Sequence, residues 1–179
     1  IVVLDATYHL PNVKRDARAE YAREHIPGAL FFDVDRVADH ANPLPHMLPS
    51  PADFAHMVGA LGISEQSNIV IYDELGLFSA PRVWWAFRTM GAAKVHILAG
   101  GGPKWRAEKR AVQTGTVTRY PAIFQAHFNR NRVADFDTVR NFLELLIEKH
   151  RMPAVFRIRR EYDSLWEEEN KLLPVEVTR

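Results

Sequence analysis

Four short apolar runs, separated by segments with helical patterning, constrain the fold of this chain most strongly. They are Ile1–Asp5, Ala29–Phe32, Asn68–Tyr72 and Lys94–Leu98. Short apolar runs bounded by turn residues are typical of strands that are buried on both faces, as in a parallel sheet. Strands that alternate with helices predict an α/β fold, a parallel sheet with helices on both of its faces.

The segments between the apolar runs carry helix signals. Residues Arg15–Arg23 are charged and rich in good helix formers. Ser50 precedes Pro51, which indicates an N-cap followed by proline in the first helical turn. A third helix is predicted from Ser79, with apolar side chains at helical spacing until Gly91. Every predicted strand before Lys94 is therefore followed by a predicted helix or turn.

Composition excludes several classes of function. The 179 residues include 23 basic and 22 acidic ones, a net charge of +1, which gives no general attraction for nucleic acid. No apolar run approaches the roughly 20 residues that a membrane-spanning helix needs. The chain has no cysteine, so disulfides, thiolate zinc sites and thiol catalysis are excluded. It opens on a strand-like run without methionine, which indicates a trimmed N-terminus.

The pattern changes after residue 115. Residues 116–134 are predicted to be an extended connector, and an amphipathic helix is predicted over Asp135–His150. Residues Met152–Ile158 are predicted to form a strand, and Glu161–Arg179 shows no clear period. About 45 residues are too few to form a second domain that matches the first.

Three motifs carry a resemblance to a known family. They are His25-Ile26-Pro27-Gly28-Ala29, His46-Met47-Leu48-Pro49 and Ser79-Ala80-Pro81-Arg82-Val83-Trp84-Trp85. In this order they resemble the first domain of the two-domain rhodanese and 3-mercaptopyruvate sulfurtransferases. The resemblance implies sulfur transfer from 3-mercaptopyruvate to a thiol acceptor such as thioredoxin, or to cyanide, without cofactor or metal. His46 after Pro45 favours this donor over thiosulfate.

The same resemblance divides the chain into three parts. Residues 1–115 are predicted to be a rhodanese-like domain of the non-catalytic N-terminal type, and 116–134 the inter-domain connector. Residues 135–179 are predicted to be a partial second rhodanese-like domain, because Tyr162–Trp166 and Leu173–Glu176 resemble the end of that domain. The middle of the catalytic domain would then be absent through a deletion, a splice form or an incomplete chain.

Asp35 and His46 are the first candidate site residues. A carboxylate can hold an imidazole in one tautomer and raise its basicity. Taken alone, an aspartate and a histidine in a proline-rich loop indicate only loop residues. The resemblance implies that the pair supports an Asp–His–Ser relay, whose serine belongs to the cysteine loop of the second domain.

The segment Asp73–Arg82 is predicted to be a strand–loop–helix turn, a geometry that points backbone N–H groups at an anion. In the active domains of the family a cysteine begins this loop, so Asp73 predicts a loop that is retained structurally and chemically silent. Phe78 and Tyr8 match residues that line the inter-domain cleft, or they pack. Arg82 binds a substrate carboxylate or, as we favour, pairs with Asp73 or Glu74.

Other functional readings have less support. A serine hydrolase centred on Ser79 lacks the flanking glycines of a nucleophile elbow, and Ser79 fits a helix N-cap better. A metal site built from His25, His40, His46, Asp33 and Asp35 has no recognised ligand spacing. The competing class is a silent rhodanese module that acts as a protein-binding or scaffold domain. No membrane is expected as a partner, and a cytoplasmic location is expected, mitochondrial in a eukaryote.

Overall fold

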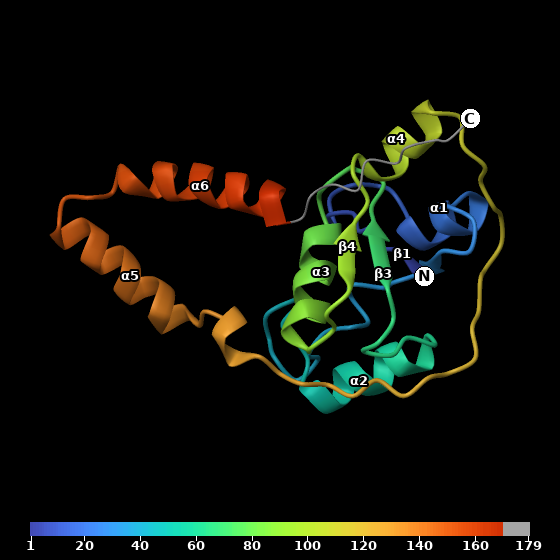
Figure 1. The fold of residues 1–179 in the computed structure, drawn as a ribbon, viewed down its shortest axis with the longest axis horizontal. Helices are drawn as coiled ribbons and strands as arrows, with labels where there is room; N and C mark the ends of the chain where they lie inside the picture. Colours follow the sequence, from blue (N-terminus) through green and yellow to red (C-terminus); the bar gives the residue numbers. More distant parts are fainter. Residues whose placement is uncertain (170–179) are drawn as a thin grey trace. The chain divides into compact units, whose positions relative to one another are not determined.

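The computed structural model describes the backbone of residues 1–169 and the side chains of residues 1–161. The described residues divide into two compact units, 1–128 and 129–169. The first unit is built on a parallel sheet of four strands in the order β2-β1-β3-β4. Figure 1 labels β1, β3 and β4 of this sheet. The strands are β1 (Val2–Asp5), β2 (Leu30–Phe31), β3 (Ile69–Tyr72) and β4 (Val95–Ile97). All four were predicted from the apolar runs, within two residues at each end.

Helices follow each strand of the first unit. They are α1 (Ala17–Arg23), α2 (Pro51–Ala60), α3 (Ala80–Thr89) and α4 (Gly101–Ala107). The chain passes from β1 to β2 through α1, and then in the opposite direction across the sheet through α2 and α3. Because parallel crossovers are right-handed, α1 lies on one face of the sheet and α2 and α3 lie on the other. Figure 1 shows α1 and α3 on either side of the strands. The predicted α/β fold with helices on both faces is confirmed.

The strand order fixes where a site can form. The chain connects β1 to β2 on one side and β3 to β4 on the other side, so the strand order reverses between β1 and β3. In open α/β sheets, ligands bind at such a point, beyond the carboxyl ends of the strands. The loops that follow β1, β2 and β3 carry Tyr8, Asp35 and Asp73, and therefore meet at this edge of the sheet.

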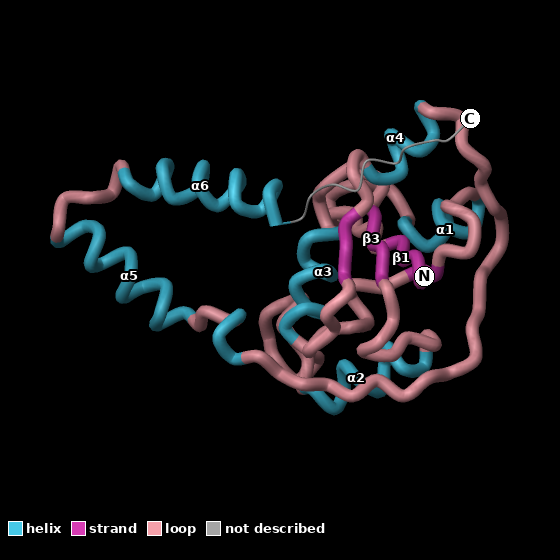
Figure 2. Tube along the Cα trace, in the orientation of Figure 1, coloured by secondary structure: helices cyan, strands magenta, loops and turns pink. Residues whose placement is uncertain are grey.

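Aromatic packing holds the predicted connector on the first unit. Phe124 is buried, with its ring centroid 5.5 Å from that of Phe54 and 6.1 Å from that of Phe87. The rings of Phe54 and Phe87 also contact each other edge to face, at 5.2 Å. Figure 2 shows this segment as a loop that runs past α2. Residues 116–128 of the connector therefore belong to the first compact unit.

Small residues let the connector approach α2 closely. The Ala122 amide donates to the Gly59 carbonyl at 2.9 Å, and an added Cβ at Gly59 would lie 2.6 Å from the Ala122 carbonyl oxygen. Gly91 has a φ of +100°, and a Cβ there would meet His127 at 2.9 Å. The connector path thus depends on glycine at these positions.

Replacing Gly59 with alanine is expected to destabilise the first unit by about 1–3 kcal/mol, because the added methyl group overpacks the contact with Ala122. Helix propensity alone would predict the opposite result, because alanine is favoured over glycine inside a helix by about 1 kcal/mol. A loss of stability would therefore report on the contact with Ala122. Urea unfolding of the chain measures the change. A variant that is more stable than the parent chain would show that the connector does not lie against α2.

Two local predictions differ from the structure. Residues Met152–Ile158 were expected as a strand, but α6 (Ala154–Glu169) is a helix. The apolar run is interrupted by Arg157, and the charged residues that follow are compatible with a helix surface. Helix α4 was not predicted, because a glycine-rich stretch disfavours a helix. Gly100, the residue before this helix, has a φ of +76°, as expected for a turn, and Gly101 begins the helix with a positive φ as well.

The second unit begins with the 3-10 helix η1 (Arg130–Arg132), followed by α5 (Phe136–Glu148) and α6. Asp135 caps α5 by accepting a hydrogen bond from the Thr138 amide at 2.9 Å. The partial second rhodanese-like domain over 135–179 stays a prediction, and its motif Leu173–Glu176 lies outside the described residues. In the part of the chain that the structure describes, no helix has the length and apolar character that a membrane crossing needs.

Candidate functional site

The structure brings Asp35 and His46 together across the loop that links β2 to α2. Asp35 Oδ1 lies 3.3 Å from His46 Nδ1, within ion-pair reach, although the two atoms are not aligned as a hydrogen bond. The Asp35 side chain is 69% exposed, whereas the His46 side chain is 27% exposed. An imidazole held beside a carboxylate can accept and return a proton.

Tyr8 completes this group from the loop after β1. Its ring meets the His46 ring edge to face, with centroids 4.9 Å apart. Desolvation and then the Asp35 charge raise the pKa of the Tyr8 hydroxyl, so it is protonated at neutral pH. Three residues from two strand ends therefore form one cluster, which we call the Asp35–His46–Tyr8 cluster.

The cluster lies between two open cavities. One, of about 470 Å³, is lined by Tyr8, Asp35 and the start of α1, including Arg15 and Arg18. The other, of about 310 Å³, is lined by both Asp35 and His46. The two arginines already have acidic partners, since Arg15 pairs with Glu20 and Arg18 with Asp33. The cluster is thus accessible to small molecules from two sides.

Arg82 does not form the predicted ion pair. Its guanidinium donates a hydrogen bond to the His46 carbonyl and stacks on the Trp85 ring, with Cζ 4.6 Å from the ring centroid. The two acids expected as partners are otherwise engaged: Asp73 accepts backbone N–H groups and Glu74 pairs with Arg106. Burial lowers the pKa of Arg82, which remains charged at neutral pH.

The loop after β3 closes around its own carboxylate. Asp73 Oδ2 accepts hydrogen bonds from the amides of Phe78, Ser79 and Ala80 at 2.7, 2.9 and 2.9 Å. Its Oδ1 accepts from the Leu75 amide at 2.9 Å, and the residue is fully buried. These amides surround the beginning of α3, where a helix favours an anion. Asp73 therefore occupies the anion-binding position of the loop.

Ser79 was expected to cap α3 through its hydroxyl. It stands at the N-cap position, but its side chain makes no capping hydrogen bond, and its Oγ is buried without a hydrogen-bond partner in the described part of the chain. Asp73 supplies the acceptor instead, so the capping group comes from the preceding strand end. A serine before a helix predicts a local N-cap, and this pattern does not reveal that Asp73 supplies the acceptor in its place.

Phe78 lies on the outer side of the same loop and is 47% exposed. Leu75 and Leu77 beside it are also exposed. Phe78 therefore does not pack in the core of this unit, and it makes no ring contact with the Asp35–His46–Tyr8 cluster. Within the described residues, no three His, Asp or Glu side chains are placed to hold a metal ion.

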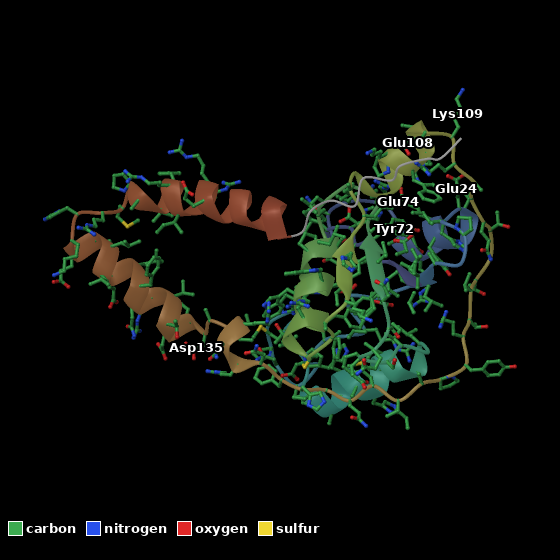
Figure 3. The ribbon with its side chains drawn as sticks, viewed as in Figure 1. Glu24, Tyr72, Glu74, Glu108, Lys109 and Asp135 are labelled. Carbon is green, nitrogen blue, oxygen red and sulfur yellow. The ribbon has the colours of Figure 1, made fainter. Side chains whose placement is uncertain are left out.

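A buried polar network beneath the site was missed by the sequence reasoning. Asp5, at the end of β1, accepts hydrogen bonds from the Tyr72 hydroxyl at 2.8 Å and from the Thr7 amide at 3.0 Å. The Glu74 amide in turn donates to the Thr7 hydroxyl at 3.1 Å. Figure 3 labels Tyr72 and Glu74, at the end of β3. The network links the loop after β1, which carries Tyr8 of the cluster, to the loop after β3, which carries Asp73.

Asp5 is expected to make stability depend on pH. Burial is the main reason that the pKa of Asp5 is raised above its ordinary value. The folded state then binds the Asp5 proton more tightly than the unfolded state, so this residue stabilises the fold less as pH rises from about 4 through its folded pKa. Relative to Asp5→Asn, the parent chain should lose free energy of unfolding over that interval in urea titrations. A constant difference would contradict the assignment.

Comparison with known proteins identifies the first unit. The sequence model of the rhodanese-like domain matches residues 13–108, more than half of the chain. The chain belongs to the rhodanese-like domain family.

Relatives and solved structures extend the match. The chain is 46% identical over 129 residues to the 3-mercaptopyruvate sulfurtransferase of Rattus norvegicus, covering 71% of this chain and 43% of the relative. It is 45% identical over 144 residues to the thiosulfate sulfurtransferase of Bos taurus, covering 79% and 48%. The crystal structure of SseA from Escherichia coli superposes with a TM-score of 0.73 at 41% identity, covering 77% of this chain and 53% of that one. The chain spans about half the length of these curated relatives.

A different family matches the end of the chain. The sequence model of the ATP synthase delta (OSCP) subunit matches residues 116–179, which include helices α5 and α6. This segment contains the predicted connector and the predicted partial second domain. The match covers about a third of the chain, and its family differs from the rhodanese-like family that was predicted for residues 135–179.

Proposed function

We propose that residues 1–128 form the non-catalytic half of a sulfurtransferase that takes sulfur from 3-mercaptopyruvate, or with less support from thiosulfate. The acceptor would be a thiol such as that of thioredoxin, or cyanide. The observation that carries the proposal is the Asp35–His46 pair, 3.3 Å apart, in which both residues line one open cavity and Asp35 also lines a second. The names of the curated relatives support the choice of donor.

The chain itself cannot carry the transferred sulfur. It has no thiol, and the loop that would hold a persulfide is filled by the Asp73 carboxylate. The sulfur-carrying cysteine must therefore belong to another domain, which faces the carboxyl ends of β1, β2 and β3. A cytoplasmic location, mitochondrial in a eukaryote, is compatible with this role.

The chemistry assigns a proton transfer to His46. The cysteine thiolate of the other domain attacks the sulfur of 3-mercaptopyruvate, an S–S bond forms, and the C–S bond breaks. The electron pair of the C–S bond passes to the carbon of the leaving enolate, which becomes pyruvate when it gains a proton. The donor thiol loses one proton in the same sequence. His46, oriented by Asp35, accepts that proton and returns it to the enolate.

A chimera tests the proposal. In it, residues 1–128 replace the matching half of the Escherichia coli 3-mercaptopyruvate sulfurtransferase, a relative 42% identical over 134 residues. The expected result is pyruvate release from 3-mercaptopyruvate by the chimera and none by the chain alone. A chimera that unfolds cooperatively in urea, and is therefore folded, but releases no pyruvate would contradict the proposal.

A second function is favoured by one observation, the exposed apolar side chains of the loop after β3. Leu77 and Phe78 are about half exposed, as in a surface that binds a protein. In that case residues 1–128 act as a scaffold module. The chimera distinguishes the two functions, because a scaffold supplies no group to the reaction and His46 would then be dispensable.

A further inference from the structure

We propose that Arg82 positions His46 for proton transfer by holding the backbone of its loop, without touching the substrate. The kinetic consequence of this inference rests on the proposed function. The positioning itself concerns contacts within residues 1–128 and can be tested on the chain alone.

The backbone of His46 requires an external support. Its φ is +57°, in the left-handed region, which costs a residue with a side chain about 1–2 kcal/mol. A residue in such a conformation persists only where its surroundings determine it. The Asp35 pair alone is a weak support, because the Asp35 side chain is largely exposed and its contact with His46 lacks hydrogen-bond alignment.

Arg82 supplies that support from a rigid element. It lies in the first turn of α3 and donates a hydrogen bond to the His46 carbonyl oxygen. Its guanidinium is fixed by the Trp85 ring one turn along the same helix, at 4.6 Å. The charge is half-buried and has no carboxylate partner among the described residues, so the carbonyl and the ring are what compensate its desolvation.

Arg82 acts on the main chain of His46, whereas the cluster contacts act on its ring. The His46 ring meets Tyr8 and Asp35, whereas the His46 carbonyl meets Arg82. Fixing the carbonyl fixes the direction in which the Cα–Cβ bond leaves the loop. The ring is thus brought to Asp35 by two constraints, one on the main chain and one on the side chain.

The same helix offers a matched control. Arg88 lies near the end of α3, is also half-buried, and also donates from its guanidinium to backbone carbonyls, those of Ala92 and Ala93. Neither of these two hydrogen bonds involves the His46 loop. Arg82→Met and Arg88→Met therefore remove equivalent groups from one helix, and only the first should disturb His46.

The first measurement uses nuclear Overhauser effects between the ring protons of Tyr8 and His46 in the chain itself. They are expected in the parent chain and in Arg88→Met, lost in Arg82→Met, and partly restored in Arg82→Lys, which keeps a donor. Dispersed amide spectra establish that each variant is folded. An undiminished Tyr8–His46 effect in folded Arg82→Met would overturn the proposal.

The second measurement uses the chimera described above with 3-mercaptopyruvate. Arg82→Met should lower kcat by about ten- to a hundredfold with little change in KM, since a misplaced group slows the reaction without weakening binding. A raised KM with unchanged kcat would instead show that Arg82 binds substrate, and would overturn the positioning role. A parent chimera without activity would reject the proposed function, and the ring contacts would still decide the role of Arg82.

Discussion

Replacement of Asp73 by alanine is expected to lower the free energy of unfolding of the first unit by about 3–5 kcal/mol, close to the most that single substitutions usually cost. The fully buried carboxylate accepts four backbone amides, including those of Phe78 and Ser79, and alanine leaves them without an acceptor. A loss of this size is a large part of the stability of an ordinary domain. Urea unfolding monitored by tryptophan fluorescence measures it.

Two controls separate this effect from a general loss of charge. Asp73→Asn keeps one acceptor oxygen and should cost less, about 1–2 kcal/mol. Asp35→Ala removes an exposed carboxylate and should change stability by less than about 0.5 kcal/mol. Equal losses for Asp73→Ala and Asp35→Ala would show that the loop does not close on the Asp73 carboxylate.

Replacement of His46 by asparagine in the chimera is expected to slow pyruvate release from 3-mercaptopyruvate by about 10²–10⁴-fold, the usual contribution of a general acid–base group. Asparagine tolerates the left-handed backbone that His46 adopts, so the loop should keep its path. The amide cannot take up and return a proton. Steady-state assays of pyruvate release, with urea unfolding as the check on folding, measure the effect.

Asp35→Asn provides a graded comparison. The amide keeps a polar group beside His46 but removes the charge that orients and stabilises the imidazolium, so a smaller loss than for His46→Asn is expected. A His46→Asn chimera with unchanged turnover would remove the proton-transfer role and favour the scaffold function.

The sheet was predictable because its signal is local. Runs such as Val2–Asp5 and Ile69–Tyr72 are apolar and bounded by turn residues, and β-strands buried on both faces need little more. The proximity of Asp35 and His46 was inferred from a resemblance, and the structure places the two side chains together. Their spacing in the sequence alone gave no such indication, because the ten intervening loop residues permit many conformations.

The partners of Arg82 and Asp73 were not predictable from the sequence. An arginine early in a helix is expected to seek a nearby acid, but here a carbonyl that is distant in sequence and a ring on the same helix take that place. Asp73 was interpreted only as the residue that replaces a cysteine. Its role as the acceptor for the amides of its own loop follows from a backbone path that no local pattern specifies.

Formation of thiocyanate by the purified chain, supplied with 3-mercaptopyruvate or thiosulfate and with cyanide, tests the central claim most directly. A domain without a thiol, whose anion position is filled by Asp73, should give the rate of the buffer alone and gain no sulfur in an intact-mass measurement. Catalysed thiocyanate formation, or a stable sulfur adduct on the chain, would contradict the account.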